Sequence, residues 1–318
     1  MIFLDILLLV VGMVLLIKGA DFFVDGASNI AKALRIPAVI IGLTLVSMGT
    51  SAPELAVSIN AAIIEKNDLS LGNVVGSNTF NTFLILGISS VIIPLVIDDG
   101  MKKYDIPIML GIYAVLLIFG FLISPSKLDV FESLALLVLF LAYMVILFVR
   151  AKNDKTEKSE TEEPITKKKV IISVILVVVG LAAIIGGSEL VVDNASKLAT
   201  SFGMTETMVG LTIVAIGTSL PELVTSVVAA VKKENDIAVG NVIGSNIFNA
   251  LLILGTTSTI LPLTLSNDSL IDLIVLFVSG LLVFIISRFS NNIKKWQGVL
   301  FVLLYIIYFV YVVIRGVV

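Results

Sequence analysis

The sequence predicts an all-α integral membrane protein with ten transmembrane helices, arranged as two inverted five-helix repeats. Hydrophobic residues make up 58% of the 318-residue chain and charged residues only 14%. A soluble domain has about a quarter charged residues, so lipid is the expected solvent for this surface. Ten apolar stretches could each cross a bilayer, and the second half of the chain repeats motifs of the first.

The ten spans follow from mean hydropathy in windows of about nineteen residues. They cover residues 1–18, 38–64, 70–97, 105–123, 129–149, 170–188, 206–231, 237–262, 270–287 and 296–314. No basic residue precedes the first apolar run, so we expect 1–18 to be a retained span and not a cleaved signal peptide.

A polar, charged stretch at 151–169 divides the chain nearly in half. Its composition is typical of a flexible linker. We therefore expect a first five-helix repeat at 1–150, a linker at 151–169 and a second, inverted five-helix repeat at 170–318.

Basic residues are distributed unevenly between the two sides of this predicted topology. If the loops alternate sides, one side holds seventeen lysines and arginines, including those of the linker, and the other holds four. Positive charge is enriched on cytoplasmic loops. We therefore expect a plasma-membrane protein with both termini outside and the central linker in the cytoplasm.

The internal repeat has a constant offset of 168 residues. Residues 42–54 match residues 210–222 at nine of thirteen positions, and residues 72–81 match 240–249 at eight of ten. Each half has five predicted spans, so the second half enters the membrane in the opposite sense. Inverted repeats supply the two related conformations that alternating access requires, which favours a transporter over a channel or a receptor.

Composition limits the chemistry of any ion site. The chain has no cysteine and no histidine, which excludes disulfides, thiolate or imidazole metal ligands and histidine proton relays. Oxygen ligands suit hard cations such as Na⁺, Ca²⁺ and Mg²⁺. The net charge of -3 gives no reason to expect a nucleic-acid partner.

The first repeated motif places a proline and a carboxylate in the middle of a span. Pro53 lacks an amide hydrogen and Gly49 loosens the preceding turn, so we expect the helix to kink or break there. Freed backbone carbonyls, the hydroxyls of Thr50 and Ser51, and the carboxylate of Glu54 would then form a cluster of oxygen ligands. The second half repeats this arrangement with Gly217, Thr218, Ser219, Pro221 and Glu222.

The second repeated motif adds polar residues from two further spans. Ser77 and Asn81 are four residues apart and share a helical face, as do Ser245 and Asn249. The inverted symmetry predicts that all four motif segments meet at the bilayer midplane.

Some motif residues also have a structural interpretation. A single kinked segment could hold a protonated glutamate bonded to a neighbouring helix, but two copies at a fixed offset favour a binding site. We interpret Asn73 and Asn241 as hydrogen-bonding or packing residues between helices. The roles of Asn78 and Asn246 stay open.

The two glutamates need a counter-charge. A charged residue at the bilayer centre costs about 2.5–3.5 kcal/mol on insertion scales, and every lysine and arginine lies in or beside a predicted loop. A bound cation or a proton must therefore neutralise Glu54 and Glu222, and two carboxylates balance one Ca²⁺.

With these motifs the sequence resembles the cation/Ca²⁺ exchanger superfamily, and specifically prokaryotic sodium/calcium exchangers. The resemblance covers essentially the whole chain, including both copies of the GTSxPE and GNxxGSNxxN signatures. It implies that the first and sixth spans slide across the other eight to alternate access.

The resemblance also implies a set of ion ligands. Ca²⁺ would lie centrally between Glu54 and Glu222, with the backbone carbonyls of Thr50 and Thr218. Asn81 and Asn249 would line the middle of the cluster. A Na⁺ site nearer the outside would use Thr218, Ser219, Glu222, Ser245 and the carbonyl of Ala215. A Na⁺ site nearer the cytoplasm would use Thr50, Ser51, Glu54, Ser77 and the carbonyl of Ser47.

Three alternatives stay open. Ca²⁺/H⁺ antiport through the same glutamates ranks second, because such exchangers typically carry a different repeat signature. The inverted repeat weighs against a cation channel, and two buried unpaired glutamates weigh against a non-transporting scaffold. Several relatives, K⁺-dependent exchangers among them, have aspartate at position 249, so Asn249 argues against K⁺ co-transport.

The sequence therefore predicts a secondary antiporter and not an enzyme. Na⁺ entry would drive Ca²⁺ exit, with both ions competing for one oxygen cluster. We expect Na⁺ and Ca²⁺ as transported substrates, no resident cofactor, the lipid bilayer as surroundings, and no nucleic-acid or obligatory protein partner.

Overall fold

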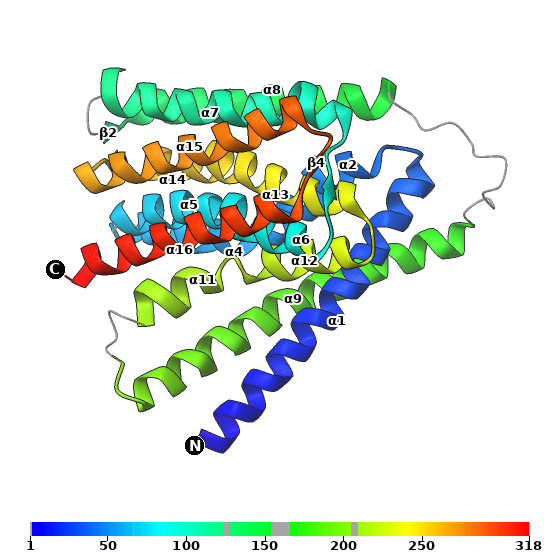
Figure 1. Ribbon diagram of the computed structural model, residues 1–318, viewed down its shortest axis with the longest axis horizontal. Helices are drawn as coiled ribbons and strands as arrows, with labels where there is room; N and C mark the ends of the chain where they lie inside the picture. Colours follow the sequence, from blue (N-terminus) through cyan, green and yellow to red (C-terminus); the bar gives the residue numbers. More distant parts are fainter. Residues whose placement is uncertain (1, 66, 124–126, 154–165, 205–208, 318) are drawn as a thin grey trace.

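The computed structural model describes residues 2–65, 67–123, 127–153, 166–204 and 209–317. These residues are almost entirely helical (Figure 1). Most helices lie side by side along one direction, while α1 (Ile2–Leu34) and α9 (Lys167–Ser201) cross them obliquely.

Within the described residues, eight helical stretches are long and apolar enough to cross a membrane. They are Ile2–Leu34, Ser70–Ile92, Met101–Ile123, Val130–Asn153, Lys167–Ser201, Asn235–Ile260, Asn267–Phe289 and Lys295–Arg315. A ninth span is a pair of helices, Ala38–Thr50 and Ala52–Ile63, bent by 46°. The expected tenth span, 206–231, includes the helices from Gly210 to Val231, while its residues 206–208 lie outside the described part. The predicted fold class of ten helices in two inverted repeats is confirmed.

The spans of the first half consist of the following helical segments after α1. They are α2 (Ala38–Ile41), η1 (Gly42–Val46), α3 (Ser47–Thr50), α4 (Ala52–Ile63), α5 (Asn67–Phe80), η2 (Asn81–Ile85), α6 (Leu86–Ile92), η3 (Met101–Asp105), α7 (Ile106–Ile118), η4 (Phe119–Ile123) and α8 (Val130–Asn153).

The second half follows the same order after α9. Its segments are η5 (Gly210–Val214), α11 (Ala215–Gly217), α12 (Leu220–Val231), α13 (Asn235–Phe248), η6 (Asn249–Ile253), α14 (Leu254–Ile260), α15 (Asn267–Phe289) and α16 (Lys295–Val317). The segments labelled η are π-helical, and η1 and η2 lie 168 residues before η5 and η6.

Two predicted spans were too short. The first and sixth were placed at 1–18 and 170–188, but α1 ends at Leu34 and α9 at Ser201. A hydropathy window detects only the apolar part of a helix, and both helices continue through more polar turns. The linker predicted at 151–169 is helical up to Asn153 and again from Lys167, and its residues 154–165 lie outside the described part.

Glycines allow α1 and α9 to approach each other closely. A Cβ atom at Gly12 would lie 2.8 Å from the carbonyl oxygen of Gly187, and one at Gly180 would lie 2.7 Å from that of Gly19. Since any side chain would clash with backbone there, only glycine permits this contact.

Two short antiparallel ribbons connect the halves. The strand β1 (Leu95–Val96) pairs with β4 (Asn292–Ile293), and β2 (Lys127–Leu128) pairs with β3 (Leu263–Thr264). Each ribbon joins one strand of the first half to one of the second.

The motif-bearing helices lie at the centre of the bundle. In the most apolar stretch of Asn235–Ile260, 94% of the residues are buried, against 22% in that of Val130–Asn153. The polar motifs are therefore enclosed by protein.

Candidate cation site

The two proline-containing spans are broken where the sequence predicted a break. The helix α3 ends at Thr50, Ser51 leaves helical geometry (φ -82°, ψ 5°), and α4 starts at Ala52. In the second half Ser219 has nearly the same conformation (φ -91°, ψ 5°) before α12 starts at Leu220. Each break exposes a helix N-terminus, whose dipole is favourable for an anion.

Glu54 and Glu222 lie in the first turns of α4 and α12 and are both fully buried. The Ser51 hydroxyl donates to Oε1 of Glu222 at 2.9 Å, and the Ser219 hydroxyl donates to Oε1 of Glu54 at 3.1 Å. Each carboxylate is therefore held by a serine of the other repeat, so the two breaks face each other.

The second oxygen of each carboxylate has no hydrogen-bond partner among the residues that the structure describes. Oε2 of Glu54 and Oε2 of Glu222 are buried without a hydrogen bond, as are the side-chain oxygens of Asn81 and Asn249. Of the five unsatisfied side-chain atoms on these residues, four are acceptors and one, Nδ2 of Asn81, is a donor, an arrangement suited to a cation.

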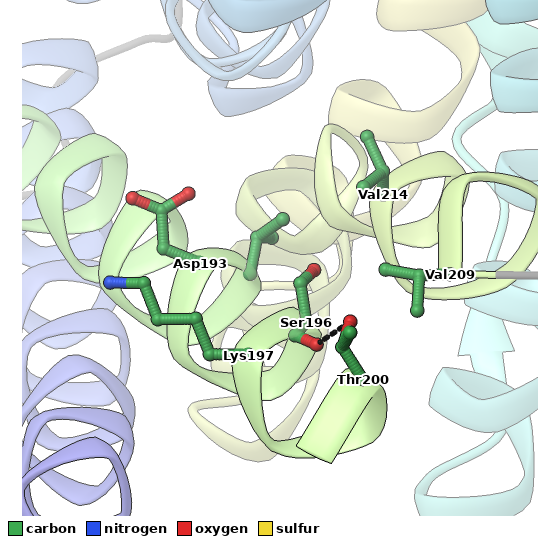
Figure 2. A pocket seen from close by; sticks show the side chains of 7 residues that line it. Asp193, Ser196, Lys197, Thr200, Val209 and Val214 are labelled. Carbon is green, nitrogen blue, oxygen red and sulfur yellow. Dashed lines mark hydrogen bonds between the residues drawn. The ribbon is translucent and has the colours of Figure 1, made fainter. Parts of the chain in front are cut away.

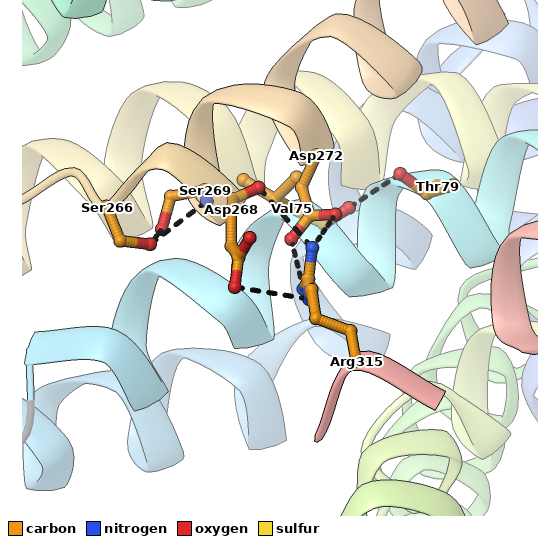
Figure 3. A network of polar contacts seen from close by, with 7 residues as sticks. All are labelled: Val75, Thr79, Ser266, Asp268, Ser269, Asp272 and Arg315. Carbon is orange, nitrogen blue, oxygen red and sulfur yellow. Dashed lines mark hydrogen bonds and ion pairs between the residues drawn. The ribbon is translucent and has the colours of Figure 1, made fainter. Parts of the chain in front are cut away.

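Basic residues of the described chain pair elsewhere. Lysines and arginines of the described chain form ion pairs with aspartates, and none of these pairs involves Glu54 or Glu222. Figure 3 shows one such network, in which Arg315 binds both oxygens of Asp272 at 3.0 and 2.8 Å. Within the described residues no group of three or more carboxylates gathers, so the cluster consists of two carboxylates and neutral oxygens.

The serine hydroxyls from the second motif lie next to the breaks. Ser77 Oγ lies 3.0 Å from Ser219 Oγ. Ser245 Oγ donates to the carbonyl of Ser47 at 3.4 Å. The structure therefore brings hydroxyls from both motifs together, as the inverted symmetry predicted.

The backbone carbonyls of Ser47 and Ala215, which the sequence analysis named as Na⁺ ligands, differ in the hydrogen bonds that they accept. The Ser51 amide donates to the Ser47 carbonyl at 3.0 Å. In the second half the Ser219 amide donates to Ile216 at 3.1 Å, so the carbonyl of Ala215, which begins α11, does not receive this bond.

The asparagines left open by sequence analysis form a hydrogen-bonded chain between repeats. Asn249 Nδ2 donates to Asn78 Oδ1 at 3.0 Å, and Asn78 Nδ2 donates to the carbonyl of Asn246 at 2.9 Å. Asn246 Nδ2 in turn donates to Thr82 Oγ1 at 2.8 Å. Thr82 was not singled out from the sequence, because it lies outside the repeated motif positions.

The two sides of the cluster are packed differently. A Cβ at Gly244 would lie 2.7 Å from Ser47 Oγ, and one at Gly240 would lie 3.1 Å from the Gly42 Cα. A Cβ at the equivalent residues Gly72 and Gly76 would have no atom of the described part of the chain within 4 Å. The α13 face against η1 and α3 is therefore closed, and the corresponding α5 face is open.

A cavity of about 530 Å³ lies between α9 and η5. Figure 2 shows Asp193 and Lys197 on one wall and Val209 and Val214 on the opposite wall. The hydroxyl of Ser196 in the same cavity has no hydrogen-bond partner in the part of the chain that the structure describes.

The equivalent part of α1 is occupied by polar contacts that the sequence did not predict. Lys232 pairs with Asp21 at 2.6 Å and Asp25 at 2.7 Å, and Ser28 donates to Glu234 at 2.8 Å. Asp25 and Ser28 lie 168 residues before Asp193 and Ser196. One end of the molecule is therefore tied to α1, while the related end on α9 is a cavity.

Comparison with known proteins places this geometry in a family. A sequence profile described as sodium/calcium exchanger protein matches residues 4–149 and 172–314. The chain belongs to the sodium/calcium exchanger protein family. It is accordingly a polytopic membrane antiporter of the cation/Ca²⁺ exchanger superfamily, and the resemblance inferred from its motifs is confirmed.

Individual relatives cover nearly the whole exchanger. It is 36% identical to the sodium/calcium exchanger MaX1 of Methanosarcina acetivorans over 98% of this chain and 99% of the relative. It is 40% identical to the putative antiporter CaxA of Alkalimonas amylolytica over 79% of each chain. A solved structure of the sodium-calcium exchanger NCX_Mj, soaked with 10 mM Na⁺ and zero Ca²⁺, aligns with a TM-score of 0.85 at 33% identity, covering 96% of this chain and 98% of the other.

Proposed function

We propose that this exchanger couples Na⁺ entry to Ca²⁺ exit by alternating access, with both ions competing for the oxygen cluster around Glu54 and Glu222. The observation that carries the proposal is the pair of buried carboxylates whose Oε2 atoms have no hydrogen-bond partner. An uncompensated buried charge is costly, so the cluster requires a positive ion, and two carboxylates match Ca²⁺.

The proposed Ca²⁺ ligands are both carboxylates and the backbone carbonyls of Thr50 and Thr218. Asn81 and Asn249 are proposed to line the middle of the cluster, which is supported by their buried side-chain oxygens that have no hydrogen-bond partner within the described residues. The Na⁺ site towards the open face uses Thr218, Ser219, Glu222, Ser245 and the Ala215 carbonyl. The Na⁺ site towards the closed face uses Thr50, Ser51, Glu54, Ser77 and the Ser47 carbonyl.

The proposed orientation places the exchanger in the plasma membrane, with both termini outside and the linker in the cytoplasm. Both ends of the chain lie at one end of the bundle, and the helices flanking the linker meet it at the other (Figure 1). The proposed units are the repeats 1–150 and 170–318, joined by 151–169. With this orientation, the cavity beside α9 faces outside and the structure represents an outward-open state.

Na⁺ coupling is favoured over proton coupling because the relative MaX1, which matches over nearly its full length, is a sodium/calcium exchanger. Ca²⁺/H⁺ antiport through the same glutamates is the rival.

The purified exchanger in proteoliposomes separates these possibilities. We expect ⁴⁵Ca²⁺ uptake when a Na⁺ gradient is imposed at fixed pH, and none with a pH gradient or a K⁺ gradient alone. Uptake driven by the pH gradient without Na⁺ would favour the rival. Electrical conduction without counter-transport would contradict antiport altogether.

A further inference from the structure

Two asparagines, one in each half of the chain, link a broken helix of their own repeat to a threonine of the opposite repeat. Asn241 Nδ2 donates to Ser226 Oγ at 2.9 Å and to the Glu222 carbonyl at 3.4 Å, while its Oδ1 accepts from Thr50 Oγ1 at 3.0 Å. The side chain is anchored on α12 and reaches the threonine at the end of α3.

Asn73 makes the same set of contacts in the other repeat. Its Nδ2 donates to Ser58 Oγ at 3.0 Å and to the Glu54 carbonyl at 3.3 Å. Its Oδ1 accepts from Thr218 Oγ1 at 3.4 Å. Both sets of residues differ by 168 in number, so the arrangement follows the inverted symmetry.

Thr50 has several acceptors within reach but only one proton to donate. Its hydroxyl lies 3.1 Å from the Val46 carbonyl, 3.3 Å from the Ser47 carbonyl and 3.0 Å from Asn241 Oδ1. A hydroxyl donates one hydrogen and keeps two acceptor lone pairs. When the hydroxyl donates to Asn241, it does not donate to the Ser47 carbonyl, so that carbonyl oxygen carries one hydrogen bond fewer. The same hydrogen bond fixes the direction in which the two lone pairs of the Thr50 oxygen point.

The two asparagine–threonine links differ in length and burial, and the shorter, more buried link lies on the more tightly packed face. Asn241 and Thr50 are both fully buried on the closed face, whereas Asn73 and Thr218 are partly exposed on the open face. The link of 3.0 Å belongs to the closed face and the link of 3.4 Å to the open face.

We propose that Asn241 and Asn73 are positioning residues. Each accepts a hydrogen bond from the hydroxyl of the facing threonine and thereby keeps Na⁺-ligating oxygens available. This inference rests on the proposed function, because it presumes that the oxygens around Thr50 and Thr218 bind Na⁺.

A double-mutant cycle tests whether Asn241 acts through Thr50. Half-saturating Na⁺ and Ca²⁺ are measured on purified protein in detergent from the shift in its thermal unfolding midpoint, which requires no transport. The loss of one hydrogen bond predicts that Asn241→Ala raises half-saturating Na⁺ about fivefold, with Ca²⁺ changing less than about twofold. A generally damaged protein would lose affinity for both ions.

In a Thr50→Val background the threonine proton is absent, so Asn241→Ala should have little further effect. Asn73→Ala should keep its full effect in that background, because it belongs to the other link. Non-additivity confined to the linked pair supports the proposal. Equal effects of Asn241→Ala with and without the Thr50 hydroxyl would overturn it.

Ser226→Ala is a second variant that tests the proposal if Asn241→Ala does not fold. It loosens the anchor of Asn241 while leaving every proposed ion ligand unchanged, so it should raise half-saturating Na⁺ in the same direction and also lose its effect in Thr50→Val. If neither ion stabilises the wild-type protein, both the proposed function and this inference fail. If the ions stabilise it but the cycle is additive, only this inference fails.

Discussion

At the residue scale, the buried carboxylate of Asp105 and those of Glu54 and Glu222 differ in their counter-charge. Asp105 is fully buried and binds Arg150 Nη1 at 2.7 and 2.8 Å, with the Tyr143 hydroxyl at 3.1 Å. Glu54 and Glu222 each accept a hydrogen bond from a serine of the other repeat and form no ion pair with a lysine or arginine of the described chain. The Asp105 carboxylate is therefore structural, and those of Glu54 and Glu222 are available to a mobile cation.

Removing one member of the Asp105–Arg150 pair should be more harmful than removing both. A buried charge without its partner costs about 3–5 kcal/mol, whereas a hydrophobic replacement of both residues is often neutral. We expect Arg150→Met to lower the thermal unfolding midpoint strongly and the double variant Asp105→Leu/Arg150→Met to recover most of the loss. An Arg150→Met protein as stable as wild type would contradict this structural role.

At the element scale, α1 and α9 form a crossed pair in contact through glycine. The residues Gly12, Gly19, Gly180 and Gly187 let the two backbones touch without intervening side chains. The tight contact joins α1 and α9 into one pair, as expected if these two spans slide together across the other eight, which is the motion that the family resemblance implies.

The glycine contact predicts different outcomes for two neighbouring substitutions in α9. A Cβ at Gly187 would lie 2.8 Å from both the Gly12 carbonyl oxygen and the Leu16 amide nitrogen, whereas a Cβ at Gly186 meets nothing within 4 Å. Gly187→Ala should destabilise the protein by about 1–3 kcal/mol and reduce Ca²⁺ flux, and Gly186→Ala should change neither. Identical thermal midpoints and fluxes for the two variants would rule out the tight crossing.

The contact between α1 and the turn after α12 holds the closed end. Lys232 lies outside the spans and pairs with Asp21 and Asp25. Partial burial opposes its charge, but the hydrogen bonds that Lys232 donates to the two aspartates outweigh that effect and raise the pKa of Lys232. The lysine therefore stays protonated at neutral pH, and the contact keeps its ionic character.

Lys232→Met should release α1 and open the closed face more often. The chain has no cysteine, so one cysteine introduced at Leu43, which is 3% exposed in η1, reports this opening by its labelling with a water-soluble maleimide. Loss of these partly exposed pairs should speed labelling about twofold to fivefold. The control Lys127→Met removes a more exposed ion pair with Asp129 and should have no effect. Unchanged labelling in Lys232→Met would show that the contact does not hold α1.

At the scale of the whole molecule, the fold could be predicted because hydropathy, charge and the repeat agreed. The breaks at Pro53 and Pro221 were predicted because proline cannot continue the hydrogen-bonding ladder of a helix. The lengths of α1 and α9 were not, because their outer turns are too polar to be detected by hydropathy. The π-helical segments were also missed, since they depend on how the backbone packs and not on a residue signature.

The candidate site could be predicted in its residues but not in its connections. The repeat identified Glu54, Glu222 and their neighbouring hydroxyls. That Ser51 binds the glutamate of the opposite repeat, and that Asn241 reaches Thr50, depends on how the halves face each other. The ion pairs of Lys232 lie outside the repeated motifs, so no pattern in one sequence pointed to them.

The central claim is that Glu54 and Glu222 together provide the negative charge for the transported ions. The most direct measurement is Na⁺-driven ⁴⁵Ca²⁺ uptake into proteoliposomes by wild type, Glu54→Gln, Glu222→Gln and the exposed control Glu189→Gln. Glutamine keeps the shape of the side chain and an acceptor for the facing serine but removes the charge. We predict background uptake for each site variant and wild-type uptake for the control, whereas exchange retained by either Glu54→Gln or Glu222→Gln would contradict the account.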